Sequence, residues 1–248
     1  MKYEITNSKK TFLFIFYILM AFNGGFFEIY SLYGFSLFTF LQTGNVANVT
    51  FNFIKRNNEA AFLNLTSLIS FVIGFSLVIL ISRFLKRKNI DNFIVSLFGC
   101  MFFIILIMAI PTYHTFGIMR IIEVILLTFY GVVLLNGFKS FNGVDFVPTM
   151  TTNNLRRCVE NGIEGYLDND KVKKSKFITY LTIFLSFATG IVISSLLLCY
   201  LHINKFSINS NCGYEINLFL IVPLITTIIC YIIYKFHKEE INTSKRAS

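Results

Sequence analysis

The sequence predicts an all-α integral membrane protein in which six transmembrane helices form two inverted three-helix repeats. Three observations lead to this fold class. The 248-residue chain is 55% hydrophobic and only 14% charged, with a mean hydropathy of +0.66, so it has more apolar surface than a soluble domain can bury. It contains six long apolar stretches. It also carries one small polar cluster twice, as QTGN at 42–45 and TTNN at 151–154.

Length and hydropathy define the predicted spans, because a helix needs about 20 apolar residues to cross about 30 Å of hydrocarbon. Residues 34–58 are too apolar for an ordinary external loop, so we expect a helix pair that dips into the outer leaflet. Residues 152–167 combine an apolar face with charged positions, which predicts an amphipathic helix along the cytoplasmic interface. The six predicted spans are 11–33, 60–84, 92–110, 117–138, 177–202 and 217–234.

The basic residues predict the orientation. With the N-terminus inside, 18 of the 22 Lys and Arg residues fall in cytoplasmic segments, and only Lys55, Arg56, Arg120 and Lys205 fall outside. This asymmetry predicts a multi-pass protein of the cell membrane with both termini in the cytoplasm. Because the basic residues lie between apolar spans, the net charge of +9 indicates membrane topology and contact with lipids, and no nucleic-acid partner. The spacing of the five Cys and three His residues predicts no metal site, and no cofactor is expected.

Small and polar residues recur in the same order in the two halves of the chain. The first half reads NGGFFEIY (23–30), QTGN and SFVIG (70–74), and the second reads NGFKSF (136–141), TTNN and SFATG (186–190). With three predicted spans in each half, residues 1–112 and 113–248 would cross the membrane in opposite directions. Inverted repeats of this kind build many membrane transporters, with binding sites where the two halves meet.

The ordered set of a GG pair with Glu28 and Tyr30, then QTGN, then FxxG in the next span resembles the YoaK-like family of bacterial multi-pass membrane proteins. The resemblance spans nearly the whole chain. Two positions depart from the family pattern, since Glu28 stands where an Asp is expected and Lys139 where an uncharged residue is expected. The function of that family is not established, so the resemblance implies a fold and a membrane location and no mechanism.

The repeated clusters supply the candidate site residues. In a helix that follows QTGN, Asn45 and Asn48 share one face, and the helix N-terminus suits an anion or a polar neutral ligand. The alternative is that Thr43 or Asn45 caps the helix and the amides tie helices together. The Glu28 carboxylate either exchanges protons within a span or is hydrated near the outer interface. The predicted substrate-binding residues are Gly24, Gly25, Glu28, Gln42, Thr43, Asn45, Asn48, Asn136, Thr152 and Asn154.

Two other features predict contacts between helices. Small residues at Ser70, Gly74, Ser186 and Gly190 favour close helix packing within the membrane, and the alternative is that they line a pore. Glu123 is expected to pair with the Arg120 guanidinium, which precedes it by three residues near the outer boundary.

These patterns favour a small transporter or channel for a small polar solute or ion, with a path through the interface of the two repeats. The alternative is a membrane scaffold or regulatory protein in which the motifs only hold helices together. A membrane enzyme acting on lipid-linked substrates is the weakest reading, because we find no acid pair, His cluster or nucleophile with a base. We therefore predict no catalytic residue and no enzyme activity. A homodimer enclosing the path is left open.

Overall fold

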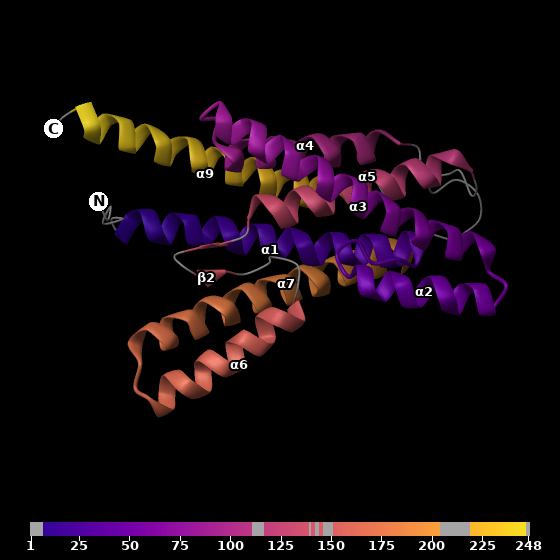
Figure 1. Cartoon of the computed structure of the whole chain (residues 1–248), viewed down its shortest axis with the longest axis horizontal. Coiled ribbons are helices and arrows are strands. Elements are labelled where there is room, and N and C mark those ends of the chain that lie inside the picture. Colours follow the sequence, from indigo (N-terminus) through magenta and orange to yellow (C-terminus); the bar gives the residue numbers. More distant parts are fainter. Residues whose placement is uncertain are drawn as a thin grey trace.

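The protein is helical over almost all of the chain that the structure describes. A computed structural model describes residues 7–110, 117–138, 140–141, 144–145, 151–203 and 219–246. A two-residue antiparallel ladder joins β1 (Ser140–Phe141) to β2 (Val144–Asp145). The helices, shown in Figure 1, are α1 (Asn7–Phe35), α2 (Gln42–Ile54), α3 (Asn58–Arg87), α4 (Asn92–Ala109), α5 (Ile118–Gly137), α6 (Thr151–Leu167), α7 (Lys171–Ile203) and α9 (Ile221–Arg246).

Five helices are long and apolar enough to cross a membrane, which makes the chain a multi-pass helical membrane protein. The five candidate spans are Phe14–Phe35, Asn58–Arg87, Asn92–Ala109, Ile118–Gly137 and Lys171–Tyr200. They correspond to the first five spans that the sequence predicts. The predicted sixth span matches only a shorter apolar helix, Ile221–Phe236, and its first residues, 217–218, lie outside the described residues. The count of six spans therefore stays a prediction.

Local signals in the sequence explain where the helices begin and end. The side chain of Asn57 caps α3 by accepting a hydrogen bond from the backbone N–H of Ala60, and Asp91 caps α4 through the N–H of Phe93. α3 also has Glu59 in its first turn and Lys86 with Arg87 in its last turn, which match the helix dipole. These polar caps at both ends let a long apolar helix stop at the water interface.

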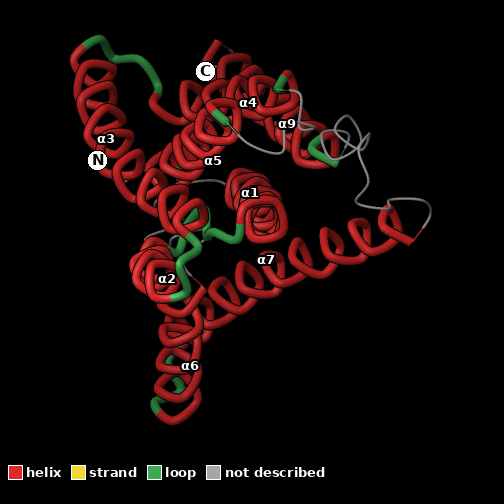
Figure 2. The backbone as a smooth tube through the Cα atoms, turned by 90° about the vertical axis from the view of Figure 1, so that its right-hand side faces the viewer, coloured by secondary structure: helices red, strands yellow, loops and turns green. Residues whose placement is uncertain are grey.

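Two pairs of parallel helices form most of the bundle. Ser186 Oγ donates to the carbonyl oxygen of Ile18 and Ser194 Oγ to that of Phe26, both across 168 residues, so α1 and α7 run in the same direction. α3 and α5 are likewise parallel, because Arg120 binds Glu59 and Thr128 bonds with Ser67, both across 61 residues. Between the pairs, α1 and α5 pack antiparallel (Figures 1 and 2).

The predicted small-residue contacts are confirmed, and they are closest between α1 and α7. A Cβ atom on Gly190 would lie 2.2 Å from the carbonyl oxygen of Phe22, and a Cβ on Gly25 would lie 2.1 Å from that of Phe187. In the other pair, Gly74 approaches the ring of Phe129 rather than a backbone. Glycine is required where two helix backbones approach each other this closely.

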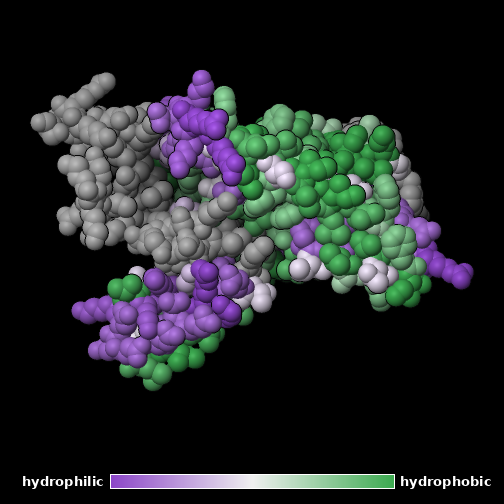
Figure 3. All heavy atoms as spheres, in the orientation of Figure 1, coloured by the Kyte–Doolittle hydropathy of each residue, from purple (hydrophilic) through white to green (hydrophobic). Residues whose placement is uncertain are grey.

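The surface divides into an apolar belt and a hydrophilic end. Hydrophobic side chains cover most of the visible bundle on the right of Figure 3, whereas hydrophilic side chains gather on the α6–α7 hairpin at the lower left. Many large apolar side chains of α3 are exposed, among them Val72, Leu80 and Phe84. A soluble protein rarely exposes so large an apolar surface, but lipid covers it in a membrane.

Candidate functional site

α2 is a short helix that carries QTGN into the interior of the bundle. Asn45 is completely buried, and its amide accepts from the backbone N–H of Phe38 at 2.8 Å and donates to the carbonyl oxygen of Phe38 at 2.7 Å. The same amide donates to Ser67 Oγ, which in turn bonds with Thr128. Asn45 therefore links the chain before α2 to α3 and, through Ser67, to α5.

The partners of Asn45 show how far along α3 and α5 its side chain lies. Ser67 lies nine residues after the start of α3, and Thr128 lies ten residues after the start of α5. At 1.5 Å of rise per residue, the Asn45 side chain sits about 14 Å along both helices from their first residues. α2 then returns toward the end at which α3 begins (Figure 1).

The predicted cap of α2 is wrong, whereas the predicted link between helices is confirmed. The helix begins at Gln42, and its N-cap residue, Leu41, makes no side-chain hydrogen bond. Asn45 lies inside the first turn and bonds to Phe38 because the preceding segment folds back against the helix. The Gln42 amide nitrogen donates to the carbonyl oxygen of Thr39 in this folded segment, and the Gln42 amide oxygen accepts a hydrogen bond from Asn45. Thr43 is exposed, and Asn48 is half-buried.

Glu28 meets the same folded segment from α1. Its Oε2 accepts a hydrogen bond from the backbone N–H of Phe40 at 3.2 Å, and the residue is half-buried. Thr39, next to it, is buried with a hydroxyl that has no hydrogen-bond partner in the described part of the chain. Phe40 and Thr39 in turn lie against Gly131 of α5, where a Cβ would be 2.9 Å from the Thr39 methyl group. Glu28, Gln42 and Asn45 thus surround one turn between α1 and α2.

TTNN begins α6, which packs antiparallel along the first half of α7. Asn154 is buried, Thr152 is exposed, and Arg157 donates to the hydroxyl of Tyr180 at 3.1 Å. Since Tyr180 lies nine residues into α7, the start of α6 lies still deeper along α7. The bounds of α6 agree with the predicted helix, and its cytoplasmic position stays a prediction.

The face of α6 that packs is not the apolar one. Leu155, Val159 and Ile163 are all exposed, by 43% to 57%. The buried positions are Asn154, Cys158, Gly162 and Gly165, and at Gly162 a Cβ would lie 2.9 Å from the ring of Phe177. In the sequence, the small residues that recur every three or four positions along α6 indicate this packed face.

The remaining predicted residues lie away from the turn that Glu28 contacts. Gly25 packs on the backbone of α7, and Gly24 is buried beside it in α1. Asn136 donates to Ser82 Oγ, which donates to Asn92, at the far end of the α3–α5 pair. The structure therefore brings Glu28, Gln42 and Asn45 together. It leaves Gly25 and Asn136 in separate contacts between helices, and Thr152 and Asn154 on α6, which packs on α7.

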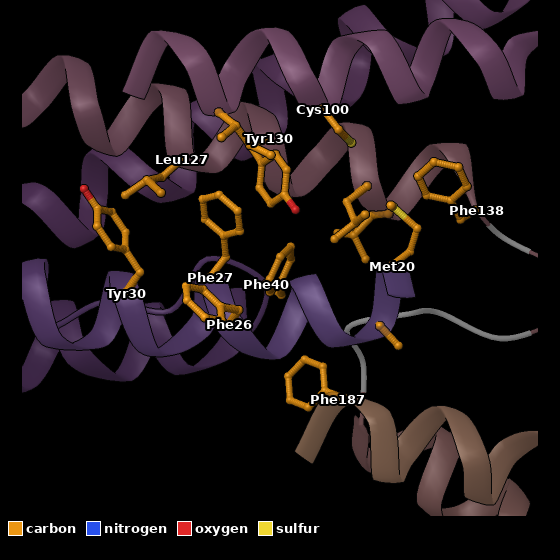
Figure 4. Close-up of a cluster of buried hydrophobic side chains, with 14 of the residues drawn as sticks. Met20, Phe26, Phe27, Tyr30, Phe40, Cys100, Leu127, Tyr130, Phe138 and Phe187 are labelled. Carbon is orange, nitrogen blue, oxygen red and sulfur yellow. The ribbon is translucent and has the colours of Figure 1, made fainter. Parts of the chain in front are cut away.

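The structure also reveals a buried pair that the sequence analysis missed. The Tyr30 hydroxyl of α1 donates to Glu123 Oε1 of α5 at 2.5 Å, and Glu123 is only 3% exposed. The predicted Arg120–Glu123 pair is wrong, because the Arg120 guanidinium binds Glu59 at 3.0 Å and the carbonyl oxygen of Gly34 at 2.8 Å. Figure 4 shows Tyr30 and Tyr130 in one cluster of buried aromatic side chains between α1 and α5.

The site contains amides, hydroxyls and two carboxylates. In the described ranges, no group of three His, Cys, Asp or Glu side chains is placed to hold a metal ion. Neither a curated protein nor a solved structure matches the chain. A family comparison matches residues 16–208, more than half of the sequence, to an uncharacterised family. The chain therefore belongs to the family described as "Protein of unknown function (DUF1275)".

Proposed function

We propose that this protein is a transporter or channel, without enzyme activity, for a small polar solute or ion. Its path would run between two inverted three-span repeats, residues 1–112 and 113–248, with α9 as the sixth span. The observation that carries the proposal is that two short helices with polar first turns, α2 and α6, each pack on the long helix that follows and run toward opposite ends of the molecule (Figure 1). Short helices that end within a membrane are a recurring feature of transporter binding sites.

The pairing of helices supports the inverted repeat. α1 packs on α7 as α5 packs on α3, and both pairs are parallel. α2 packs on α3 as α6 packs on α7, and α4 packs on α5 as α9 packs on α1. Exchanging α1 with α5, α2 with α6, α3 with α7 and α4 with α9 reproduces these contacts. Because α1 and α5 are antiparallel, the two sets of helices have opposite directions, as inverted repeats require.

The orientation in this proposal follows the basic residues, with both termini in the cytoplasm. QTGN then faces the outer side through α2, and TTNN faces the cytoplasm through α6. Arg120, Glu59 and Gly34 tie the outer ends of α5, α3 and α1 together. At the other end, Asn136, Ser82 and Asn92 tie α5, α3 and α4 together. Contacts between helices are therefore present at both ends of the bundle.

Thiol labelling tests the proposed path. The exposed positions Thr43 and Thr152 are changed singly to Cys in a chain whose five native Cys are replaced, and membrane-impermeant reagents are added from each side. We expect Thr152→Cys to react from the cytoplasmic side, and Thr43→Cys to react from the outer side in the fraction of molecules that open there. Val72→Cys and Leu80→Cys, at exposed apolar positions of α3, are controls that lipid should protect.

A membrane scaffold is the second candidate, and the complete burial and full bonding of Asn45 favour it. If Thr43→Cys and Thr152→Cys resist labelling from both sides while the protein keeps its fold, the clusters are dry packing motifs. The transport proposal would then fall, and the scaffold would replace it. A homodimer is compatible with both functions and is tested by the mass of the protein in detergent micelles.

A further inference from the structure

A buried carboxylate lies at the contact between α1 and α5, the helices that begin the two proposed repeats. Glu123 is 3% exposed, within a helix whose length and composition suit a membrane span. An ionisable residue within a span is costly and marks a functional site by default. Glu123 lies among aromatic side chains, since its partner Tyr30 stacks on Phe219 at 6.1 Å and packs edge-on against Phe27.

Among the residues that the structure describes, the groups around Glu123 compensate an ionised carboxylate only in part. Its hydrogen bond comes from the neutral hydroxyl of Tyr30, at 2.5 Å. The Arg120 guanidinium, one turn earlier, acts on the carboxylate only at a distance, because it binds Glu59 on α3 and the carbonyl oxygen of Gly34 directly. Glu28, on the same helix as Tyr30, is an additional negative charge when ionised, and it bonds to the N–H of Phe40. A buried charge in this position is unfavourable unless a proton or water compensates it.

In the described part of the chain, the other titratable groups near this contact lie further along α5, toward α4 and α9. Tyr130 of α5 is two turns further along, with Cys100 of α4 and Cys230 of α9 near its hydroxyl. All three are fully buried and neutral in their ordinary protonated forms. None of them supplies a positive charge to Glu123.

We infer that Glu123, held by Tyr30, is a proton-binding residue that couples the transport cycle to protons. This inference rests on the proposed function. Proton uptake forms an O–H bond on the Glu123 carboxylate as one breaks in a hydronium ion at the water-accessible side, and release reverses the transfer. Tyr30 keeps its own proton and acts as a positioning residue. Because Tyr30 and Glu123 sit on antiparallel α1 and α5, any shift between these helices changes the hydrogen bond and the hydration of the carboxylate.

Infrared difference spectroscopy tests this inference without a transported solute. The full chain is reconstituted in phosphatidylcholine vesicles and the bath pH is stepped up and down within the range where the protein stays folded. We expect a carboxylic acid C=O band that appears and disappears reversibly with pH. The band should be lost in Glu123→Gln and shifted in frequency in Tyr30→Phe, which removes only the donating hydroxyl. It should persist in Glu59→Gln, the matched change of a partly exposed carboxylate.

Two outcomes would overturn the inference. One is a band that Glu123→Gln leaves intact, and the other is a Glu123 band that does not change at any pH, which would make the residue a permanently neutral structural group. If Glu123→Gln does not fold, the frequency shift in Tyr30→Phe still decides between these cases. The spectra are independent of thiol labelling at Thr43 and Thr152, so failure here leaves the transport path standing as an uncoupled channel.

Discussion

The two helical hairpins of the molecule, α2–α3 and α6–α7, share an arrangement but are held together differently. In the first, the Asn45 amide fixes α2 through hydrogen bonds to Phe38 and Ser67. In the second, small side chains at Cys158, Gly162 and Gly165 let α6 lie directly on α7. The repeated sequence clusters therefore mark equivalent places in the two hairpins, while the forces that fix those places differ.

The outward surfaces of the two short helices, α2 and α6, also differ. The exposed residues of α2 include Val46, Phe51 and Ile54, which suit lipid. α6 exposes an apolar stripe as well, but it also carries Arg156 and Glu160, which form an exposed ion pair. A charged face next to a span needs water, so α6 requires a wet side along its length that α2 does not.

The largest expected effect lies at the contact between the parallel helices α1 and α7. In Gly190→Ala the added methyl group would lie 2.2 Å from the carbonyl oxygen of Phe22, and a helix backbone cannot move aside locally. We expect the free energy of unfolding to fall by about 3 kcal/mol or more. Gly74→Ala in α3 should cost only about 1 kcal/mol, because the Phe129 ring that it meets can rotate.

Thermal unfolding in detergent micelles measures both changes. Gly34→Ala is the control, because a Cβ at that position has no atom within 4 Å, and it should be neutral. An equal fall in the free energy of unfolding in Gly190→Ala and Gly74→Ala would mean that α1–α7 and α3–α5 are equally close-packed.

The next effect tests how α2 is fixed. Asn45→Ala leaves the N–H and C=O of Phe38 and the hydroxyl of Ser67 without this partner in a buried setting. We expect a loss of about 3 kcal/mol in the free energy of unfolding, from several buried polar groups at once. Asn48→Ala, one turn later on the same helix and half-buried, is the matched control and should change it by less than about 0.5 kcal/mol. Chemical denaturation in micelles compares them, and a mild Asn45→Ala variant would show that the amide is replaceable by water.

Much of this arrangement could be predicted because membrane spans leave a direct record in hydropathy. α1, α3, α4, α5 and α7 follow from their apolar length alone, and the bounds of α6 follow from its periodicity. The helix pair expected over 34–58 is wrong, because one helix, α2, forms there and begins without the predicted side-chain cap. The packed face of α6 could not be predicted from its apolar stripe. Next to lipid, apolar side chains have no reason to turn inward, and Gly162 and Gly165 pack because they are small.

The candidate site was predictable only in part, for a different reason. The partner of Asn45 in α3 and the partner of Glu123 in α1 depend on how helices meet across the bundle. Glu123 and Arg120 are three residues apart, which fits a pair within one helix, but Glu59 and Gly34 lie closer to the guanidinium once α1 and α3 are in place. Tertiary contacts overrode the local spacing.

The smallest expected effect compares the ion pairs at the two ends of the molecule. Arg120→Gln loses the pair with Glu59, one hydrogen bond to Gly34 and a contact over the Phe35 ring, so the free energy of unfolding should fall by about 1 kcal/mol. Arg156→Gln loses only a solvent-exposed pair with Glu160, worth less than about 0.5 kcal/mol. Raising the salt concentration should reduce both differences, and that of Arg156→Gln more, because exposed charges are screened more strongly. If Arg120→Gln also makes Thr43→Cys more reactive from the outer side, the contacts of Arg120 close that side. If stability falls while reactivity stays the same, they only brace the helix ends.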